Sequence, residues 1–533
     1  MEKMILKLET MKVNKFYFGL CFFIALSHGL LYYNYFQYDP VLARDDTTLI
    51  LPLKDVGSFF EYVKAVRSNA ILDFQPIRDL SFLVNIKIIQ LTNISTFHIT
   101  NFALFILSIF LFIRLLDILG FSRYQIVSSS LIFSAHPIMV SSVGWISARK
   151  HSLALVFVLF ALHNYFKHKK LTFTSIVFYF LSILSHQIFI LFPAWILLHS
   201  KIKKQKVELG RFAFMSVFGG TVLVMALGFL KEIGGLDRVN VSYKSFTFME
   251  NISRYVISAG RTVVQIFFPV SISAEYYQGS VLGIAGIPVL ILFILLLYKS
   301  KNREDSLLWI SLAVLFHLPI FVTFINDTYI FMTLICTIVS LSYYFKNNPL
   351  NINSKIKTVS LIICLFLLMT KTFSASQMWK SDLSLWQYSH KNEGSPYTSI
   401  ILGSQLLKHN EKLALEMIVW GVSNYDISIN WNIFIFFLTS IHSSSLPVQQ
   451  KIKILSDCYK VHEVYEAFYA LTLIEGNYEQ MKEGIKRMKP VLEHIKILEN
   501  QNIKGITIIS ELRSLCRIVS EKGQACAELG VAY

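Results

Sequence analysis

Two adjacent carboxylates, Asp45 and Asp46, are the residues of this sequence best suited to chemistry. They lie in the stretch YDPVLARDDTTLI, just after an apolar run at residues 16–36. One carboxylate of such a pair can take a proton as a general base while its neighbour orients a ligand. A solvated pair of loop acids is the alternative, and residue type alone leaves that alternative open.

Further polar residues interrupt the apolar runs or stand at their ends. Arg149 follows IMVSSVGWISA, beside Lys150, and an arginine there can bind two oxygens of a phosphate at the membrane surface. Snorkelling of a long basic side chain at a helix end is the alternative. Because polar residues at membrane depth usually face the bundle interior, we also treat these as binding candidates, with a turn role as the alternative: His136, His186, Gln187, Arg261, Glu275, Tyr276 and Asp327.

The sequence contains no recognisable motif for binding a metal or a nucleotide. The histidines His136, His151 and His186 have no spacing that matches a known metal cage, so structural roles are expected for them. No phosphate-binding loop, GxGxxG, GxSxG or HExxH motif occurs in a suitable context. We therefore expect no required cofactor and no protein metal site, and leave a divalent cation open.

The composition indicates a membrane protein. Of 533 residues, 54% are hydrophobic and only 16% charged, and the mean hydropathy is +0.52. A soluble chain carries about 25% charged residues. The net charge of +16 is spread over short clusters between apolar runs, as expected of cytoplasmic loops, so nucleic acid is not an expected partner.

Apolar runs of the length needed to cross a bilayer predict an all-α, polytopic membrane helix bundle of about 11 spans in residues 1–373. The stretch 253–270, with its two arginines, is expected to be a partly buried or interfacial helix. The basic clusters then put 37–96 outside the cytoplasm as the first external loop. The predicted spans are 16–36, 97–117, 124–141, 151–166, 171–185, 187–200, 211–230, 281–298, 306–324, 329–345 and 356–373.

Residues 374–533 lose the long apolar runs and have amphipathic helical spacing. They predict a soluble helical domain, and helix-pair repeats fit although no fixed period is clean. With the N-terminus inside, this domain also lies outside the cytoplasm.

A series of short motifs follows the same order as in one family. In this chain the motifs are Asp45-Asp46, Phe74-Gln75-Pro76-Ile77, Phe97-His98 with Asn101, His136-Pro137 with Trp145-Ile146 and Arg149, Ser185-His186-Gln187 with Pro193, Pro269 with Ile272-Ser273, Glu275 and Tyr276, Asp327-Thr328-Tyr329, and Trp379 with Trp386. This series resembles C-type (GT-C) integral membrane glycosyltransferases. It is most similar to the TMTC branch, the protein O-mannosyltransferases with a tetratricopeptide-like C-terminal domain.

Charged residues of the family pattern are changed in three of these motifs. Gln75 stands in place of an arginine, His186-Gln187 in place of Lys-Glu, and Thr328 in place of an arginine. These changes bear on the identity of the donor and the acceptor, and on whether the chain is active.

The resemblance implies transfer of a hexose from a polyprenyl-phosphate donor to a hydroxyl of a protein or glycan, with inversion, on the extracytoplasmic face. Asp45 is then the general base, Asp46 orients the sugar or acceptor, and Arg149 and Arg261 bind the donor phosphate. Tyr329 joins the binding candidates. The sequence is rich in Lys, Ile, Phe and Asn, which is typical of an AT-rich genome and favours a bacterial inner membrane over the endoplasmic reticulum. The alternatives are a transporter or flippase for a lipid-linked sugar or other solute, and a catalytically inactive membrane scaffold.

Overall fold

The computed structural model is helical throughout the part of the chain that it describes. The described residues are 2–36, 46–50, 53–54, 56–58, 61–62, 75–92, 95–206, 208–232, 248–269, 271–274, 281–318, 327–347, 353–407 and 409–424. Within them the backbone forms α-helices and short 3₁₀ turns, and no strand. The predicted all-α fold class is confirmed for these residues.

The chain divides into two compact units. The first comprises Met1–Phe229 and Phe248–Glu393, and the second comprises Leu230–Thr247 and Gly394–Tyr533. The division falls after residue 393, whereas the sequence pattern places the change of character at 373/374. Gly394, with φ of +58°, ends the last helix of the first unit in the left-handed conformation that glycine adopts most easily.

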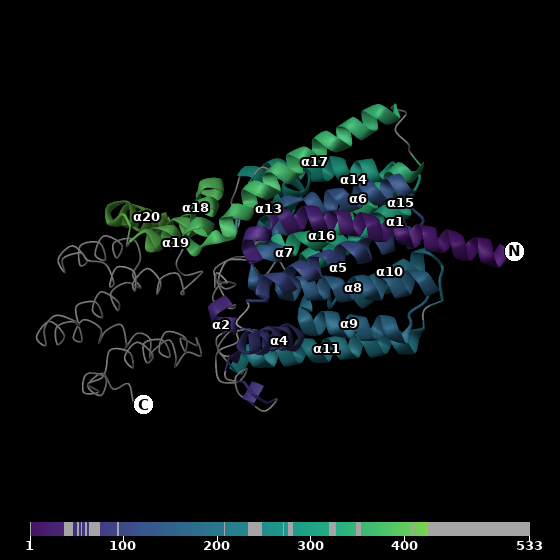
Figure 1. Ribbon diagram of the computed structural model, residues 1–533, viewed down its shortest axis with the longest axis horizontal. Helices are drawn as coiled ribbons and strands as arrows, with labels where there is room; N and C mark the ends of the chain where they lie inside the picture. The colour runs from purple at the N-terminus through teal and green to yellow at the C-terminus, as the bar shows by residue number, and fades with distance from the viewer. Residues whose placement is uncertain are drawn as a thin grey trace, which may run out of the picture. The chain divides into compact units, whose positions relative to one another are not determined.

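The helices of the first unit run largely side by side, with α2 and α7 at the end away from the N-terminus (Figure 1). Their bounds are α1 Glu2–Leu31, α2 Asp46–Ile50, α4 Pro76–Thr92, α5 Phe97–Ile118, α6 Arg123–Ala135, α7 Val140–Gly144, α8 Arg149–His168, α9 Phe173–Ser185, α10 Phe192–Ile202, α11 Leu209–Glu232, α13 Phe248–Phe267, α14 Val281–Tyr298, α15 Arg303–His317, α16 Asp327–Asn347, α17 Ser354–Ser376 and α18 Asp382–Glu393. Short 3₁₀ turns connect several of them: η1 Tyr33–Phe36, η3 Pro137–Met139, η4 Ile146–Ala148, η5 Gln187–Phe189 and η7 Gln377–Lys380.

Each predicted span overlaps one of these helices. By length and composition, four helices of the described part can cross a membrane, and five if one bent pair is counted as a single span. Five further apolar helices are shorter than this test requires. The structure is therefore that of a membrane helix bundle, while the predicted number of crossings stays a prediction.

The bent pair breaks at His136-Pro137. Arg123–Ala135 and Pro137–Gly144 meet at 53°. Pro137 lacks a backbone N–H and keeps the residue before it extended, which ends α6. The His136 imidazole caps the following turn, because its Nδ1 accepts a hydrogen bond from the Ile138 N–H at 3.3 Å. The break thus turns residues 137–149 into a series of short helical pieces at one end of the bundle.

Glycines allow α13 to pack against α14 with backbone in contact. A Cβ on Gly260 would lie 2.2 Å from the Gly283 carbonyl oxygen, and one on Gly286 would lie 2.0 Å from the Gly260 carbonyl oxygen. Small residues permit this close approach between membrane helices. The stretch predicted to be a partly buried helix is accordingly a full helix, with Arg261 and Gln265 on its buried face.

The described part of the second unit contains an antiparallel helix pair, α19 (Pro396–Leu406) and α20 (Glu411–Asn424). A Cβ on Gly403 would meet the Ala414 carbonyl oxygen at 2.7 Å, and one on Gly421 would meet the Pro396 carbonyl oxygen at 2.7 Å. Such a pair fits the predicted soluble helical domain, whose remainder, residues 425–533, lies outside the described residues.

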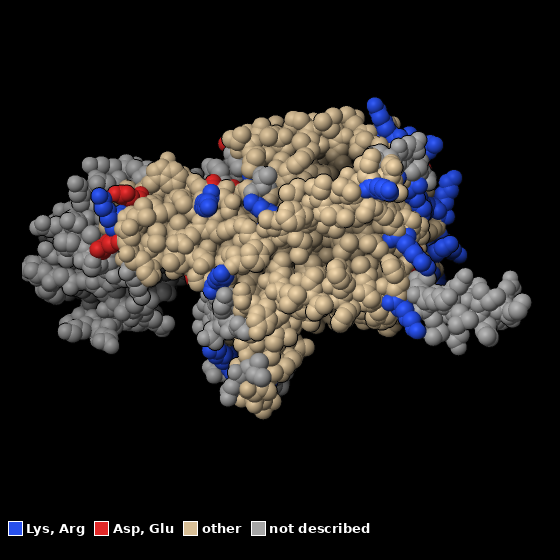
Figure 2. Space-filling view, turned by 45° about the horizontal axis from the view of Figure 1, so that its top comes forward, with Lys and Arg blue, Asp and Glu red and all other residues tan. Residues whose placement is uncertain are grey.

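Basic side chains gather at the end of the first unit that holds the N-terminal helix's start (Figure 2). The α10–α11 turn meets the start of α15 there, through the 2.8 Å ion pair between Lys203 and Asp305. Lys346 of α16 donates to the Leu119 carbonyl at 3.4 Å in the same region. The bundle therefore has one basic end, and α2 lies at the other end.

Candidate active site

Asp46 is fully buried and fixed at the start of α2. Its Oδ1 accepts a hydrogen bond from the Ser147 backbone N–H at 2.8 Å and a second from the Ser147 hydroxyl. Two donors on one carboxylate oxygen are the arrangement expected for the ionised form. Asp46 thus ties α2 to the 3₁₀ turn η4, 101 residues further along the chain.

An apolar cluster holds α2 in this position. Side chains on α2 and just after it pack against α4, the start of α5 and η4. The buried members are Leu49, Ile50, Leu53, Val56, Phe82, Ile86, Phe97 and Ile146. Burial of an apolar side chain of this size stabilises the fold by about 1.5–3 kcal/mol. The cluster therefore holds α2 in place, and with it the buried Asp46 carboxylate at the start of this helix.

Arg149, the first residue of α8, is fully buried beside this cluster. Its partners are carbonyl and amide oxygens of α4 and α5. Its guanidinium carbon also lies 4.8 Å from the centre of the Phe82 ring. The hydrogen bonds run from Nε to Asn101 Oδ1 (2.8 Å), from Nη1 to Asn85 Oδ1 and the Ser81 carbonyl (3.3 Å), and from Nη2 to the Phe97 carbonyl (2.8 Å).

These hydrogen-bond partners of Arg149 are uncharged, and the Asp46 carboxylate interacts with its guanidinium electrostatically. The sequence proposed Arg149 as a ligand of the donor phosphate. The structure instead engages the guanidinium in a clamp between α4, α5 and α8, so its first role is to position the start of α8.

A third charged group, missed in the search for chemistry along the sequence, lies at the start of α4. Arg78 is fully buried, and its Nη2 lies 2.7 Å from Asp79 Oδ1. Arg78 also donates from Nη1 to Gln75 Oε1 at 3.1 Å, and Tyr62 donates to Asp79 Oδ2 at 3.0 Å. The available signal was the spacing, because residues three apart on a helix share a face and Arg78 stands three residues after Gln75.

Two histidines lie beside this arginine with their rings in contact at a tilt of 32°. The ring centres of His151 and His186 are 4.3 Å apart, and His151 interacts electrostatically with Arg78. His186 Nδ1 accepts from the Ile188 N–H at 3.0 Å and so caps η5. When neutral, His186 therefore carries its proton on Nε2. The expected structural role of His186 is seen, and it is brought to the same corner as Arg78. Gln187 follows it and is half-buried.

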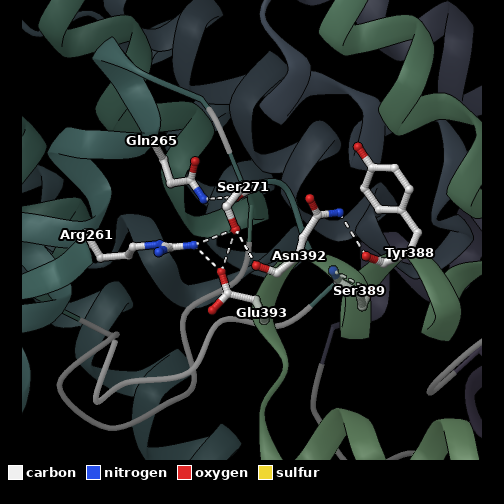
Figure 3. A network of polar contacts seen from close by, with 8 residues as sticks. Arg261, Gln265, Ser271, Tyr388, Ser389, Asn392 and Glu393 are labelled. Carbon is white, nitrogen blue, oxygen red and sulfur yellow. Dashed lines mark hydrogen bonds and ion pairs between the residues drawn. The ribbon is translucent and has the colours of Figure 1, made fainter. Parts of the chain in front are cut away.

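His136 and Arg261 belong to a different part of the bundle. His136 Nε2 lies 3.1 Å from the Ile266 carbonyl of α13 and donates to it, since Nδ1 is occupied as an acceptor. Arg261 of α13 forms an ion pair with Glu393 of α18 (Figure 3). The Ser271 hydroxyl donates to Glu393 Oε1 at 2.8 Å within the same network.

Several predicted site residues lie outside the described residues: Asp45, Glu275 and Tyr276. Asp327 and Tyr329 fall in the first turn of α16, and their side chains lie outside the description as well. The neighbour of Asp45 is nevertheless fixed. Asp45 directly precedes the anchored Asp46, and consecutive Cα atoms are about 3.8 Å apart.

The charged residues at the starts of α2, α4 and α8 carry a net positive charge. Arg78, Arg149 and Lys150 bring three positive charges, and Asp46 and Asp79 bring two negative ones. Arg149 and Lys150 also occupy the first turn of α8, where the helix dipole disfavours cations. This corner is thus suited to an anionic ligand beside a carboxylate.

Comparisons with known proteins give one distant relative. A protein O-mannosyl-transferase of Caenorhabditis elegans is 24% identical to this chain over 361 residues, which cover 60% of this chain and 49% of that protein. The chain spans about half the length of that relative. No protein-family model matches the sequence, and no solved structure matches it.

Proposed function

We propose that this chain is a membrane-embedded glycosyltransferase that transfers a hexose from a polyprenyl-phosphate donor to a hydroxyl of a protein or glycan. The distant similarity to a protein O-mannosyl-transferase supports glycosyl transfer at this coarse level. The observation that carries the finer proposal is the anchored Asp46, which lies beside the cationic start of α8.

In this proposal Asp45 is the general base. The acceptor hydroxyl attacks the anomeric carbon of the donor sugar, the bond from that carbon to the phosphate oxygen breaks, and the hydroxyl proton passes to the Asp45 carboxylate. Attack opposite the leaving phosphate inverts the configuration. A positioned general base contributes about 10²–10⁴-fold to the rate. Asp46 keeps its neighbour in place through Ser147.

The leaving polyprenyl phosphate is placed at the start of α8. Negative charge develops on the phosphate oxygen in the transition state, and fixed cations stabilise it most in a site that excludes water. Lys150 is half-buried and adjacent to the clamped Arg149. We assign Lys150 the direct contact with the phosphate and Arg149 the electrostatic support, because the Arg149 donors are engaged by the protein.

Arg78 offers an explanation for one departure from the family pattern. Where the family has arginine, this chain has Gln75, yet Arg78 reaches the Gln75 side chain from one helical turn away. We propose that a guanidinium is thereby kept in the same corner. His186 and Gln187 stand in place of Lys-Glu. The His186 ring contacts the His151 ring, and His151 interacts electrostatically with Arg78.

The basic end of the bundle supports an extracytoplasmic site. Positively charged loops of membrane proteins stay on the cytoplasmic side, and here they lie at the end away from α2 (Figures 1 and 2). The donor's lipid tail can then remain in the membrane while its phosphate reaches the outer surface. A bacterial inner membrane is the proposed location, with the endoplasmic reticulum as the alternative.

A donor screen tests the function. Purified full-length protein in detergent is given radiolabelled hexoses linked to polyprenyl phosphate, and in parallel the same hexoses linked to nucleotides, with a peptide library as acceptor. We expect transfer from a polyprenyl-phosphate donor alone. Transfer from the nucleotide sugars would contradict the donor assignment. The transporter alternative is tested on protein reconstituted into vesicles, where movement of the lipid-linked sugar across the membrane without any transfer would favour it.

A further inference from the structure

A groove opens at the basic end of the bundle, away from the candidate active site. It has a volume of about 830 Å³ and lies between α6, α16 and α17, beneath the α5–α6 turn. This volume falls within the range of small-molecule sites. The groove is lined by residues 120–122, Tyr124, Gln125, Ser128, Ser129, Ile132, Ile338, Leu341, Ser342, Phe345, Lys346, Ile356, Lys357, Ser360, Leu361 and Cys364.

The groove lies beside the N-terminal half of α17, because the buried residues of this helix are all in its C-terminal half, while the first half touches α6 through the 3.4 Å hydrogen bond from the Tyr124 hydroxyl to the Lys357 carbonyl. Thr372 is fully buried and donates to the Ala135 carbonyl at 2.6 Å. Toward its start the same helix exposes more than half of Ile356, Val359 and Ile362. Apolar side chains exposed on both sides of this half are suited to lipid, since water would penalise them.

A polar seam forms the floor of the groove. Gln125 Nε2 donates to the Ser342 carbonyl at 2.9 Å, and the Ser129 and Ser342 hydroxyls lie 3.1 Å apart. Above this seam the walls are aliphatic, with Ile132 and Leu361 among them. A molecule bound in the groove therefore needs a polar head group beside the seam and a hydrocarbon chain beside the aliphatic walls.

The mouth of the groove is cationic. Lys346 and Lys357 both line it, and none of its described lining residues is acidic. The Lys346 ammonium lies 5.4 Å from the centre of the Phe121 ring, which places the charge over the α5–α6 turn. A phosphate at this level would meet two ammonium groups and no competing carboxylate from the described lining.

We infer that this groove binds an anionic membrane phospholipid. Its phosphate lies between Lys346 and Lys357, and one acyl chain lies against the apolar walls between α6 and α17. Charge complementarity selects an anionic headgroup over a zwitterionic one, and the apolar walls select a lipid over free phosphate. This site is separate from the proposed glycosyl transfer and does not depend on it.

Native mass spectrometry of the delipidated full-length protein tests the assignment. Phosphatidylglycerol is titrated into wild type, into Lys346→Gln/Lys357→Gln, and into Lys299→Gln/Lys301→Gln, a control from the same basic end outside the groove. Each lysine near a membrane surface contributes about fivefold to anionic-lipid affinity. We expect the groove pair to weaken binding about 25-fold and the control pair to leave it within about twofold.

A second variant separates the groove from general surface charge. Ser360→Trp fills the groove and keeps both lysines, whereas Thr370→Trp adds the same ring to an exposed position further along α17. Ser360→Trp should abolish binding and Thr370→Trp should not. Equal loss in the control pair, equal affinity for phosphatidylcholine, displacement by millimolar inorganic phosphate, or unchanged binding in Ser360→Trp would each overturn the inference. Asp45→Asn should bind the lipid as wild type does.

Discussion

Arg149 and Arg261 are both buried in the same helical unit, and they are neutralised in different ways. Arg149 donates to carbonyl and amide oxygens, with Asp46 acting on it electrostatically. Arg261 has a carboxylate in direct contact, from Glu393. The side chains are 0% and 1% exposed, so burial does not distinguish them.

The difference separates a corner with net charge, around Arg149, from an ion pair that links two helices, Arg261–Glu393, here called the latch. A buried ion pair with matched charges adds little net field, because each charge cancels the other. Around Arg149 the cations outnumber the acids, which leaves an attraction for an anion. The Arg261–Glu393 pair instead joins α13 to α18, 132 residues apart (Figure 3). We therefore place the proposed chemistry in the first corner, and the predicted role of Arg261 toward the donor phosphate stays a prediction.

Removing the Arg149 guanidinium should have the largest effect on stability. Arg149→Met leaves the buried Asn85, Asn101 and Phe97 oxygens without their donor. An unsatisfied buried polar group costs about 1–3 kcal/mol, so we expect a loss of about 4 kcal/mol or more. Denaturant unfolding in detergent micelles measures it.

Arg149→Lys is the matched control for charge. It keeps the cation but cannot span the four acceptors. We expect it to recover less than half of the lost stability. Full recovery would show that charge alone, and not the clamp geometry, holds α8 in place.

Breaking the latch should cost somewhat less and should be repairable. Arg261→Met leaves Glu393 buried without its cation, at about 3 kcal/mol. The double variant Arg261→Met/Glu393→Leu should regain most of this, because a buried ion pair exchanged for apolar groups is often neutral. A double variant as unstable as the single one would remove the distinction drawn between the two corners. The same unfolding assay applies.

Ser147→Ala tests the anchor on Asp46. It removes the hydroxyl donor and keeps the backbone donor, so about 2 kcal/mol of stability should be lost. Transfer activity should fall with it, because the acid pair is held less firmly. Ser152→Ala, at a buried serine in the first turn of α8, is a control that should leave activity near wild type. Equal activity loss in both variants would argue against a specific anchor.

The smallest effect concerns the other acid of α18. Burial raises the pKa of the Asp382 carboxyl above its ordinary value. The folded state therefore loses stability as the pH rises from about 4, the unfolded value, through the raised folded value. Asp382→Asn should stabilise by a few tenths of a kcal/mol at pH 7, since solvent screens the group, and should have no effect well below pH 4. Unfolding measured at both pH values checks this.

Local patterns in the sequence predicted the helices well. Each predicted span overlaps a helix, because apolar length and flanking charge are properties of neighbouring residues. The break at His136-Pro137 was missed, because the predicted span 124–141 runs through it, whereas α6 ends at Ala135. The stretch 253–270 was predicted from its two arginines to be a partly buried or interfacial helix, and Arg261 in it is buried, while its place relative to the membrane stays a prediction.

The partners within the site could not be predicted in this way. Asp46 meets Ser147 across 101 residues, and Arg261 meets Glu393 across 132. Such pairs depend on how whole helices pack, and no local period encodes them. For the same reason the contacts of Arg149 with α4 and α5 could not be predicted, and its role toward the donor phosphate stays a prediction. Arg78 was passed over because it lies in the predicted external loop 37–96, and no local pattern shows that this segment packs against α8.

The most direct measurement is the rate of sugar transfer from the polyprenyl-phosphate donor by Asp45→Asn. We predict a loss of about 10²–10⁴-fold, with an unfolding midpoint equal to that of wild type and with Asp45→Glu retaining part of the rate. Transfer by folded Asp45→Asn at the wild-type rate would contradict the assignment of the acid pair at the start of α2 as the catalytic centre.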